Sequence, residues 1–181
     1  LEKNKAIFAF ALYAFQTGHH ATYVISKQNI KPYIKTDDSK GMIPDFLVGG
    51  ESSDGITWWV VELKGISDKV FASDGEHVYF NSVTNKGIFQ LFEYIDFCNE
   101  NQSMLREVFK LKDFREPNAL MLIGNETEFS NTRKKKMKAA WNRLHPKKLE
   151  IKTYNWLLRN FEEIYKQLKC KEYENSESWL G

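Results

Sequence analysis

Apolar residues fall into short runs along the chain, and their spacing predicts an order of helices and strands. Residues 2–16 have the apolar content of a buried helix, and residues 21–25 and 31–35 have the composition of short strands. Two stronger apolar runs, "IPDFLVG" (43–49) and "TWWVVELKG" (57–65), flank the turn-forming sequence "GESSDG". They predict an antiparallel hairpin.

The second half of the chain alternates between the two kinds of element. A polar loop over 67–86 is expected to lead into a helix from Gly87 to about Asn99. Beyond it the pattern predicts a buried strand at 119–124, a basic helix capped by Ser130 or Asn131, a strand at 149–154 and a helix at 155–169. Strands and helices mixed in this way predict an α/β or α+β layered fold.

Three ionisable residues interrupt the two strongest apolar runs: Asp45, Glu62 and Lys64. Side chains at positions i and i+2 of a strand share a face, so Glu62 and Lys64 should project together while Val61 and Leu63 point to the opposite side. If the two runs pair, Asp45 reaches the same end of the sheet. The pattern therefore predicts that two carboxylates and one ammonium group converge.

This grouping has a direct chemical consequence. Two carboxylates about 4 Å apart repel by roughly 4 kcal/mol at an effective dielectric constant near 20, so they need a proton or a cation between them. Lys64 offsets one negative charge, and a hard cation such as Mg²⁺ suits the other. The chemistry predicted is metal-assisted phosphodiester hydrolysis, with Lys64 stabilising developing charge rather than acting as a base. The alternative is an ordinary Glu–Lys pair on an exposed strand.

The helix expected after Gly87 also carries candidate residues. It is apolar on nearly all sides, which predicts burial, while Gln90 and Tyr94 lie one turn apart on one face. Gln90 could hold Lys64, a water or a phosphate oxygen, or could instead form a structural hydrogen bond to the backbone. Lys86, just before this helix, is a candidate phosphate contact by its position.

Charge is concentrated in one stretch. Eight of the 26 basic residues lie between Asn131 and Lys148, where there is no acid, and the remainder has 18 basic against 24 acidic residues. Lys134, Lys135 and Lys138 are therefore candidate nucleic-acid contacts. A solvated helix face is the alternative.

Composition sets the remaining limits. At 181 residues and 42% hydrophobic content, the chain has the composition of one globular domain rather than a disordered or fibrous protein. Two cysteines are too few for a disulfide framework, which favours a reduced, cytoplasmic protein. The apolar run within residues 2–16 has about ten residues, too few to span a bilayer, so no membrane partner is expected. His19 and His20 lack further ligands at zinc-binding spacing. Because the first residue is Leu1, we expect a fragment of a longer chain.

The combined motifs resemble a known family. The stretch "IPDFLVGG…WWVVELKG" is similar to the core of PD-(D/E)XK nucleases, with Pro44 and Asp45 in its first half and Glu62 to Lys64 in its second. "GIFQLFEYIDF", "NALMLIGN" and "IKTYNWLL" narrow the resemblance to the Shedu family of prokaryotic anti-phage defence nucleases. The similarity covers roughly residues 40–165.

The resemblance implies a restriction-endonuclease-like fold, a central mixed sheet flanked by helices, as a single nuclease domain over 1–181 with a core of about 20–165. It implies Mg²⁺-dependent DNA cleavage, with Mn²⁺ as a substitute, and a homo-oligomer, either dimer or tetramer. A variable N-terminal region would precede this fragment. A metal-binding glutamate from the first helix is common in the superfamily, and here Glu2 is the only acid before Asp37.

Together, the motifs, helix positions and charge give one set of candidate site residues. They are catalytic Asp45, Glu62, Lys64 and Gln90, metal ligands Asp45 and Glu62, and DNA-binding Lys86, Tyr94, Lys134, Lys135 and Lys138. Two alternatives stay open. One is a nucleic-acid-binding or assembly module of the same fold with weak or lost catalysis, and the other is a restriction-type or RNA-directed nuclease.

Overall fold

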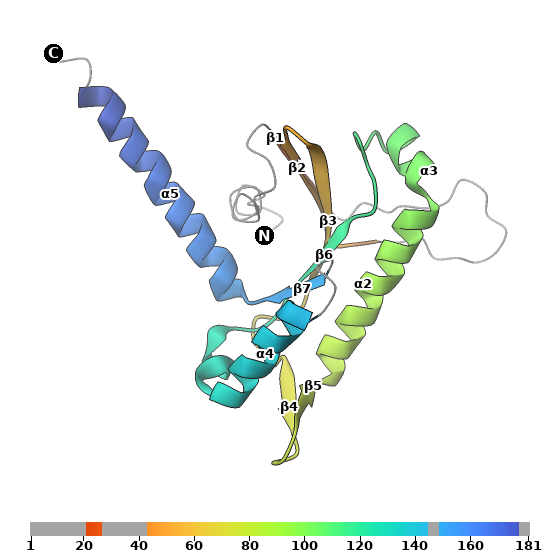
Figure 1. Ribbon diagram of the computed structural model, residues 1–181, viewed down its shortest axis with the longest axis vertical. Helices are drawn as coiled ribbons and strands as arrows, with labels where there is room; N and C mark the ends of the chain where they lie inside the picture. Colours follow the sequence, from red (N-terminus) through yellow and green to blue (C-terminus); the bar gives the residue numbers. More distant parts are fainter. Residues whose placement is uncertain (1–20, 27–42, 145–148, 178–181) are drawn as a thin grey trace.

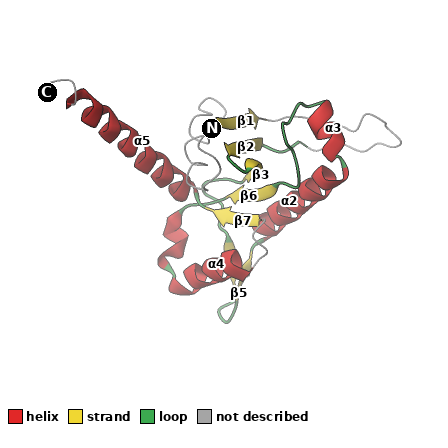
Figure 2. Cartoon of the chain, turned by 45° about the horizontal axis from the view of Figure 1, so that its top comes forward, coloured by secondary structure: helices red, strands yellow, loops and turns green. Residues whose placement is uncertain are grey.

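The centre of the computed structural model, which describes residues 21–26, 43–144 and 149–177, is a five-stranded sheet in the order β1–β2–β3–β6–β7 (Figure 2). The strands are β1 (Ala21–Ser26), β2 (Phe46–Ser52), β3 (Gly55–Leu63), β6 (Asn118–Leu122) and β7 (Leu149–Lys152). The first three strands are antiparallel neighbours, whereas β3, β6 and β7 run parallel. The predicted mixed sheet is therefore confirmed. The helix expected at 2–16 and the strand at 31–35 lie outside the described residues.

The β2–β3 hairpin has the predicted antiparallel arrangement. Its register places Val48 opposite Trp59 and Gly49 opposite Trp58. A Cβ atom at Gly49 would lie 3.0 Å from carbon atoms of the Trp58 ring. The glycine thus leaves room for the indole to lie flat across the neighbouring strand.

Each face of the sheet carries its own apolar core, and different helices cover the two faces (Figure 1). Trp58 packs on the face covered by α2 (Ser82–Glu100), and Trp59 packs on the face that receives the start of α5 (Tyr154–Glu177). Neighbouring residues of a strand point to opposite faces, so each tryptophan packs in a different core.

The helix predicted from Gly87 begins five residues earlier, at Ser82. The Asn81 side chain caps it by accepting a hydrogen bond from the Thr84 backbone N–H at 2.8 Å. Asparagine is a favoured N-cap residue, but Asn81 lies within residues 67–86, which we expected to form a loop. Lys86 consequently lies within the first turns of α2 instead of before the helix.

The polar loop expected at 67–86 contains two short strands. β4 (Phe71–Ser73) and β5 (Val78–Phe80) form a separate antiparallel hairpin. The rings of Phe71 and Phe80 stack with centroids 5.1 Å apart. Three-residue strands give too short an alternation for the sequence pattern to separate them from loop.

Helix α2 is not buried on nearly all sides, contrary to the prediction. Ile88 and Leu91 face the sheet, but Phe89 is 65% exposed and Phe92 is 39% exposed. The helix therefore buries one stripe against the sheet, and its exposed side mixes these two aromatic rings with polar and charged residues.

The C-terminal half follows the predicted order. α4 (Thr132–Leu144) is the basic helix, and Asn131 is its cap because its side-chain oxygen accepts from the backbone N–H groups of Arg133 and Lys134. β7 and α5 confirm the last predicted strand and helix. Two short elements were not predicted, α3 (Gln102–Glu107) and the 3-10 helix η1 (Glu126–Ser130).

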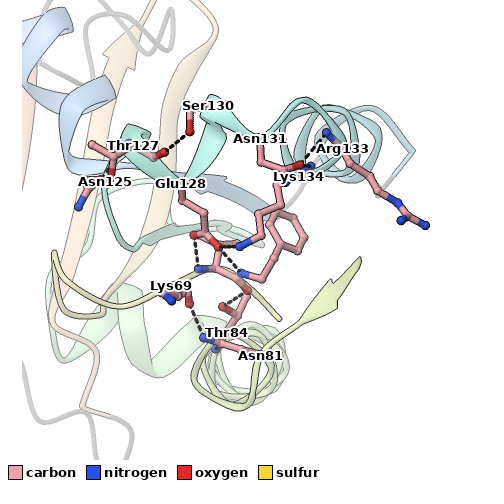
Figure 3. A network of polar contacts seen from close by, with 12 residues as sticks. Lys69, Asn81, Thr84, Asn125, Thr127, Glu128, Ser130, Asn131, Arg133 and Lys134 are labelled. Atoms are coloured by element: carbon pink, nitrogen blue, oxygen red, sulfur yellow. Dashed lines mark hydrogen bonds and ion pairs between the residues drawn. The ribbon is translucent and has the colours of Figure 1, made fainter. Parts of the chain in front are cut away.

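One carboxylate fastens β4 to the segment before α4 (Figure 3). Glu128 accepts hydrogen bonds from the Val70 and Phe71 backbone N–H groups at 2.7 and 3.1 Å, and from the Lys134 ammonium at 2.9 Å. On the other side of the same strand, the Thr84 hydroxyl donates to the Val70 carbonyl at 2.8 Å. This network joins β4, α2 and α4.

Replacing Glu128 with alanine should lower the free energy of unfolding by about 2–4 kcal/mol, because two buried N–H groups and a half-buried ammonium would lose their acceptor. Urea unfolding measures the change. Glu76→Ala, a change to an exposed acid in the β4–β5 turn, is the matched control and should be nearly neutral. Equal stability of the two variants would contradict this role for Glu128.

Candidate active site

Asp45 stands directly before β2 and is anchored to the neighbouring strand. Its Oδ2 accepts a hydrogen bond from the Leu63 backbone N–H at 2.8 Å. Pro44 is buried beside it, which fixes the chain at the entry to the sheet. The hairpin pairing therefore brings Asp45 to the C-terminal end of β3, where the sequence placed it.

Glu62 and Lys64 lie on the face of β3 covered by α2. The Lys64 ammonium contacts Glu62 Oε1 at 2.9 Å and Gln90 Oε1 at 2.6 Å. Glu62 is only 6% exposed, so this ion pair is largely shielded from water. Val61 and Leu63 pack in the core of the opposite face. Gln90 thus contacts Lys64, one of the two arrangements left open by the sequence.

Tyr94 lies one turn after Gln90 and has a structural partner. Its hydroxyl donates to the Ile43 carbonyl at 3.3 Å, linking α2 to the segment before Asp45. Burial, with the nearby carboxylates of Glu62 and Asp45, raises the pKa of Tyr94 to about 12. The hydroxyl therefore stays protonated at neutral pH and serves as a donor.

The backbone of Lys64 is held from two sides. Its N–H donates to the Leu122 carbonyl at 2.9 Å, and its carbonyl accepts from the Tyr154 hydroxyl at 2.7 Å. Burial and the nearby carboxylates of Asp45 and Asp68 raise the pKa of Tyr154 to about 12. Tyr154 is thus a permanent hydrogen-bond donor that fixes the chain where β3 ends.

The turn after Lys64 is also tightly fixed. Asp68 Oδ2 accepts from the Gly65 N–H at 2.7 Å, and the Gly65 carbonyl accepts from the Gly124 N–H at 3.1 Å. Gly124 has a φ angle of +66°, and a Cβ there would lie 2.5 Å from the Asp68 carbonyl oxygen. Only glycine meets both demands without strain.

Burial raises the pKa of Glu62 above its ordinary value, Lys64 opposes this shift, and the Asp45 charge adds to it. A raised carboxyl pKa means that the folded chain binds the proton more tightly than the unfolded chain. The contribution of Glu62 to stability is therefore greatest below the ordinary Glu pKa of about 4.3 and is lost as the pH rises through the raised folded value. Ionised Glu62 costs stability at neutral pH.

We expect Glu62→Gln to unfold at or above the wild-type temperature at pH 7 in EDTA, since glutamine avoids burying a charge and still offers Lys64 an oxygen. Near pH 4, where Glu62 is largely protonated, the two proteins should melt alike. Thermal unfolding at both pH values measures this. A wild type that is clearly the more stable at pH 7 would show that the ion pair outweighs burial.

The two carboxylates retain capacity for a cation. Asp45 uses Oδ2 for Leu63 and Glu62 uses Oε1 for Lys64; within the described ranges, the other oxygen of each has no hydrogen-bond partner. No group of three or more His, Cys, Asp or Glu side chains suited to a metal occurs among the same residues. Two carboxylates fit Mg²⁺, which commonly takes one or two from the protein and completes its shell with water and phosphate oxygens. Glu2 lies outside the described residues.

The candidate DNA contacts occupy different environments. Lys86 is exposed on α2, one turn before Gln90. Lys134 is paired with Glu128. Lys135 and Lys138 lie on a separate face of α4, beside a cavity near the start of α5. The structure therefore does not bring the three lysines of α4 together with the Asp45–Glu62–Lys64 site.

Two residues at the site, Tyr154 and Gly87, had no predicted role. Tyr154 belongs to the motif "IKTYNWLL", and its bond to Lys64 spans 90 positions. Gly87 lies where α2 crosses β3, and a Cβ there would lie 2.9 Å from Lys64 Cε. A glycine inside an otherwise helical pattern was the signal available for this close approach.

A mixed sheet with helices on both faces, and a carboxylate–lysine cluster where β3 ends, defines a restriction-endonuclease-like class of protein. The sequence model for the C-terminal part of the Shedu protein SduA matches residues 1–158. The chain therefore belongs to the Shedu family, a nuclease-associated family of antiviral defence. A search of curated proteins returned no match.

Within the described residues, no helix is both long and apolar enough to cross a membrane.

Proposed function

We propose that this chain is a Mg²⁺-dependent DNA endonuclease of the PD-(D/E)XK type that acts in anti-phage defence, with Mn²⁺ as a substitute metal. The observation that carries the proposal is the placement of Lys64, whose ammonium bridges Glu62 and Gln90 beside Asp45. A simple exposed Glu–Lys pair would need neither the burial of Glu62 nor an amide from another element.

Each residue has a separate task in this proposal. Asp45 and Glu62 would hold the cation through the oxygen that each has left. When bound, Mg²⁺ would polarise the scissile phosphate and lower the pKa of a water molecule. Lys64 donates to the phosphate and offsets charge that develops during cleavage, and Gln90 keeps the ammonium aimed at that position.

DNA would approach across the start of α2 and the exposed side of α4. Lys86 is one turn from Gln90, close enough to contact a phosphate next to the cleaved one. Arg133 and Lys136 are exposed on α4 and can add contacts to the backbone. Tyr94 supports the site through Ile43, so its contribution to binding is indirect.

Assembly into a dimer or tetramer stays a prediction.

The test is cleavage of supercoiled plasmid with Mg²⁺ and then with EDTA, using wild type, Glu62→Gln and the control Glu150→Gln. Glu150 lies outside the site, and its Oε2 forms an ion pair with the Lys152 ammonium at a distance of 2.8 Å. Cleavage by wild type and control, lost in EDTA and in Glu62→Gln, supports the proposal. Cleavage unaffected by EDTA or by Glu62→Gln would refute it.

A parallel assay with single-stranded RNA separates the alternatives. RNA cleavage without DNA cleavage would make the chain an RNA-directed nuclease. DNA that is shifted on a gel by wild type and Glu62→Gln alike, yet cut by neither with Mg²⁺ or Mn²⁺, would favour the binding module.

A further inference from the structure

A cavity of about 580 Å³ opens between η1, α4 and the start of α5, and none of its lining residues belongs to the Asp45–Glu62–Lys64 site. Its charged lining consists of Lys135, Lys138, Arg159 and Glu126. The volume lies in the range of small-molecule sites, which run from about 300 to 1,000 Å³. Three cations against one carboxylate make it a positively charged recess.

The single carboxylate of the cavity is already neutralised. Arg159 donates to both oxygens of Glu126 through its two terminal nitrogens. Such a fork-to-fork pair leaves neither charge in need of another partner. The excess positive charge of the recess therefore belongs to Lys135 and Lys138.

Among the residues that the structure describes, two neighbouring lysines form ion pairs with glutamates, whereas Lys135 and Lys138 do not. Lys134 is paired with Glu128 at 2.9 Å, and Lys152 is paired with Glu150 at 2.8 Å. Throughout the described part of the chain, no carboxylate forms an ion pair with Lys135 or Lys138. The acids around the cavity are thus all committed to other cations.

The Lys138 ammonium is partly buried, so the lack of an ion-pair partner among the described residues is unfavourable for it. Its side chain is half-buried, and its ammonium lies 5.0 Å from the centre of the Phe129 ring. Burial, with the nearby Lys152 and Arg159 cations, lowers the pKa of Lys138 below its usual range, and the carboxylates of Glu126 and Glu150 offset this only in part. A half-buried cation without an ion-pair partner is unfavourable, and an anion entering the cavity would relieve that cost.

The polar groups around the lysines are occupied. The Asn142 side chain bonds the Ile151 carbonyl and N–H at 3.3 Å each, and the Ser130 hydroxyl donates to the Thr127 carbonyl at 2.9 Å. Recognition would therefore rest on two ammonium groups. They suit a ligand with at least two negative charges and several oxygens.

We propose that this cavity binds the phosphate groups of a soluble phosphorylated compound, such as a pyrophosphate-containing nucleotide. A recess with a half-buried lysine fits a small ligand better than a duplex, which can instead reach the exposed Arg133 and Lys136 of the same helix. Ligand binding in this cavity does not depend on the chemistry at Glu62, so the two proposals are tested separately.

The test is titration of the protein with pyrophosphate by calorimetry, in EDTA and at an ionic strength of about 0.15 M. EDTA keeps cations from bridging pyrophosphate to Asp45 and Glu62. The variants are Lys135→Met and Lys138→Met, and the control is Lys136→Met, which removes the same charge from an exposed position outside the cavity.

Each cavity variant should weaken pyrophosphate binding by about tenfold or more, equivalent to about 1.4 kcal/mol, while Lys136→Met stays within about twofold. Lys138→Met should melt no lower than wild type, because it removes an unpaired half-buried charge, so lost binding would not reflect unfolding. No binding of pyrophosphate by wild type would overturn the proposal, as would an equal loss in Lys136→Met.

A second arm distinguishes the source of the phosphate. Binding of a fluorescent DNA duplex is measured by anisotropy for the same four proteins. A soluble ligand predicts that the cavity variants lose no more duplex affinity than Lys136→Met. If Lys135→Met and Lys138→Met selectively lose the duplex while pyrophosphate does not bind, the cavity belongs to the DNA path and the proposal fails.

Discussion

Replacing Lys64 with methionine should slow DNA cleavage by about 10²–10³-fold while Mg²⁺ binds at least as tightly as to wild type. The ammonium lies 2.9 Å from Glu62 and offsets the negative charge of the site. Its removal takes away the proposed donor to the phosphate and at the same time makes the site more negative. Catalysis and metal affinity should therefore change in opposite directions.

Single-turnover cleavage and calorimetric titration with Mg²⁺ measure the two quantities. Lys112→Met is the matched control. Lys112 also contacts a glutamate, Glu51, at 2.9 Å, but Glu51 lies at the turn end of the β2–β3 hairpin, opposite to the end that carries Glu62. Glu62→Gln should lose both cleavage and Mg²⁺ binding. A Lys64→Met protein that binds Mg²⁺ more weakly would mean that Lys64 organises the ligands instead of stabilising charge.

Gly87→Ala should destabilise the protein by about 1–3 kcal/mol and slow cleavage by about 10²-fold. Alanine in a helix is ordinarily better than glycine by about 1 kcal/mol. Here a Cβ would lie 2.5 Å from Met121 Sδ and 2.9 Å from Lys64 Cε. Met121 is fully buried, so α2 or Lys64 must shift. Either movement separates Lys64 from Gln90.

Urea unfolding and plasmid cleavage with Mg²⁺ test both effects. Glu93→Ala, on the exposed side of the same helix, should leave stability and cleavage nearly unchanged. A Gly87→Ala protein more stable than wild type would show that helix propensity outweighs the close approach. Loss of stability with full cleavage would show that Lys64 keeps its position when α2 moves.

The core of the site could be predicted because its determinants are local. Glu62 and Lys64 share a face through strand periodicity alone, and Asp45 joins them through a hairpin whose turn is readable in the sequence. Gln90 was predictable only in part. Helical spacing placed it beside Tyr94, but which partner it contacts depends on how α2 crosses the sheet.

Features that depend on distant contacts were missed or wrongly predicted. The Tyr154 bond to Lys64 joins elements that no local pattern connects. The apolar pattern of α2 predicted burial around the whole helix, yet Phe89 is 65% exposed and Phe92 is 39% exposed. Lys134 looked like part of one basic face, but Glu128 holds it inside a structural network. Charge counts do not reveal such pairing.

The wide sequence separation within the site has a consequence for protein synthesis. Asp45, Glu62, Lys64 and Gln90 are synthesised before two of their supports. These are β6, which pairs with β3, and Tyr154, whose hydroxyl donates to the Lys64 carbonyl. A nascent chain that has not reached residue 154 lacks the second of these supports for β3. The order of translation therefore delays the finished site until Tyr154 has been made and has left the ribosome.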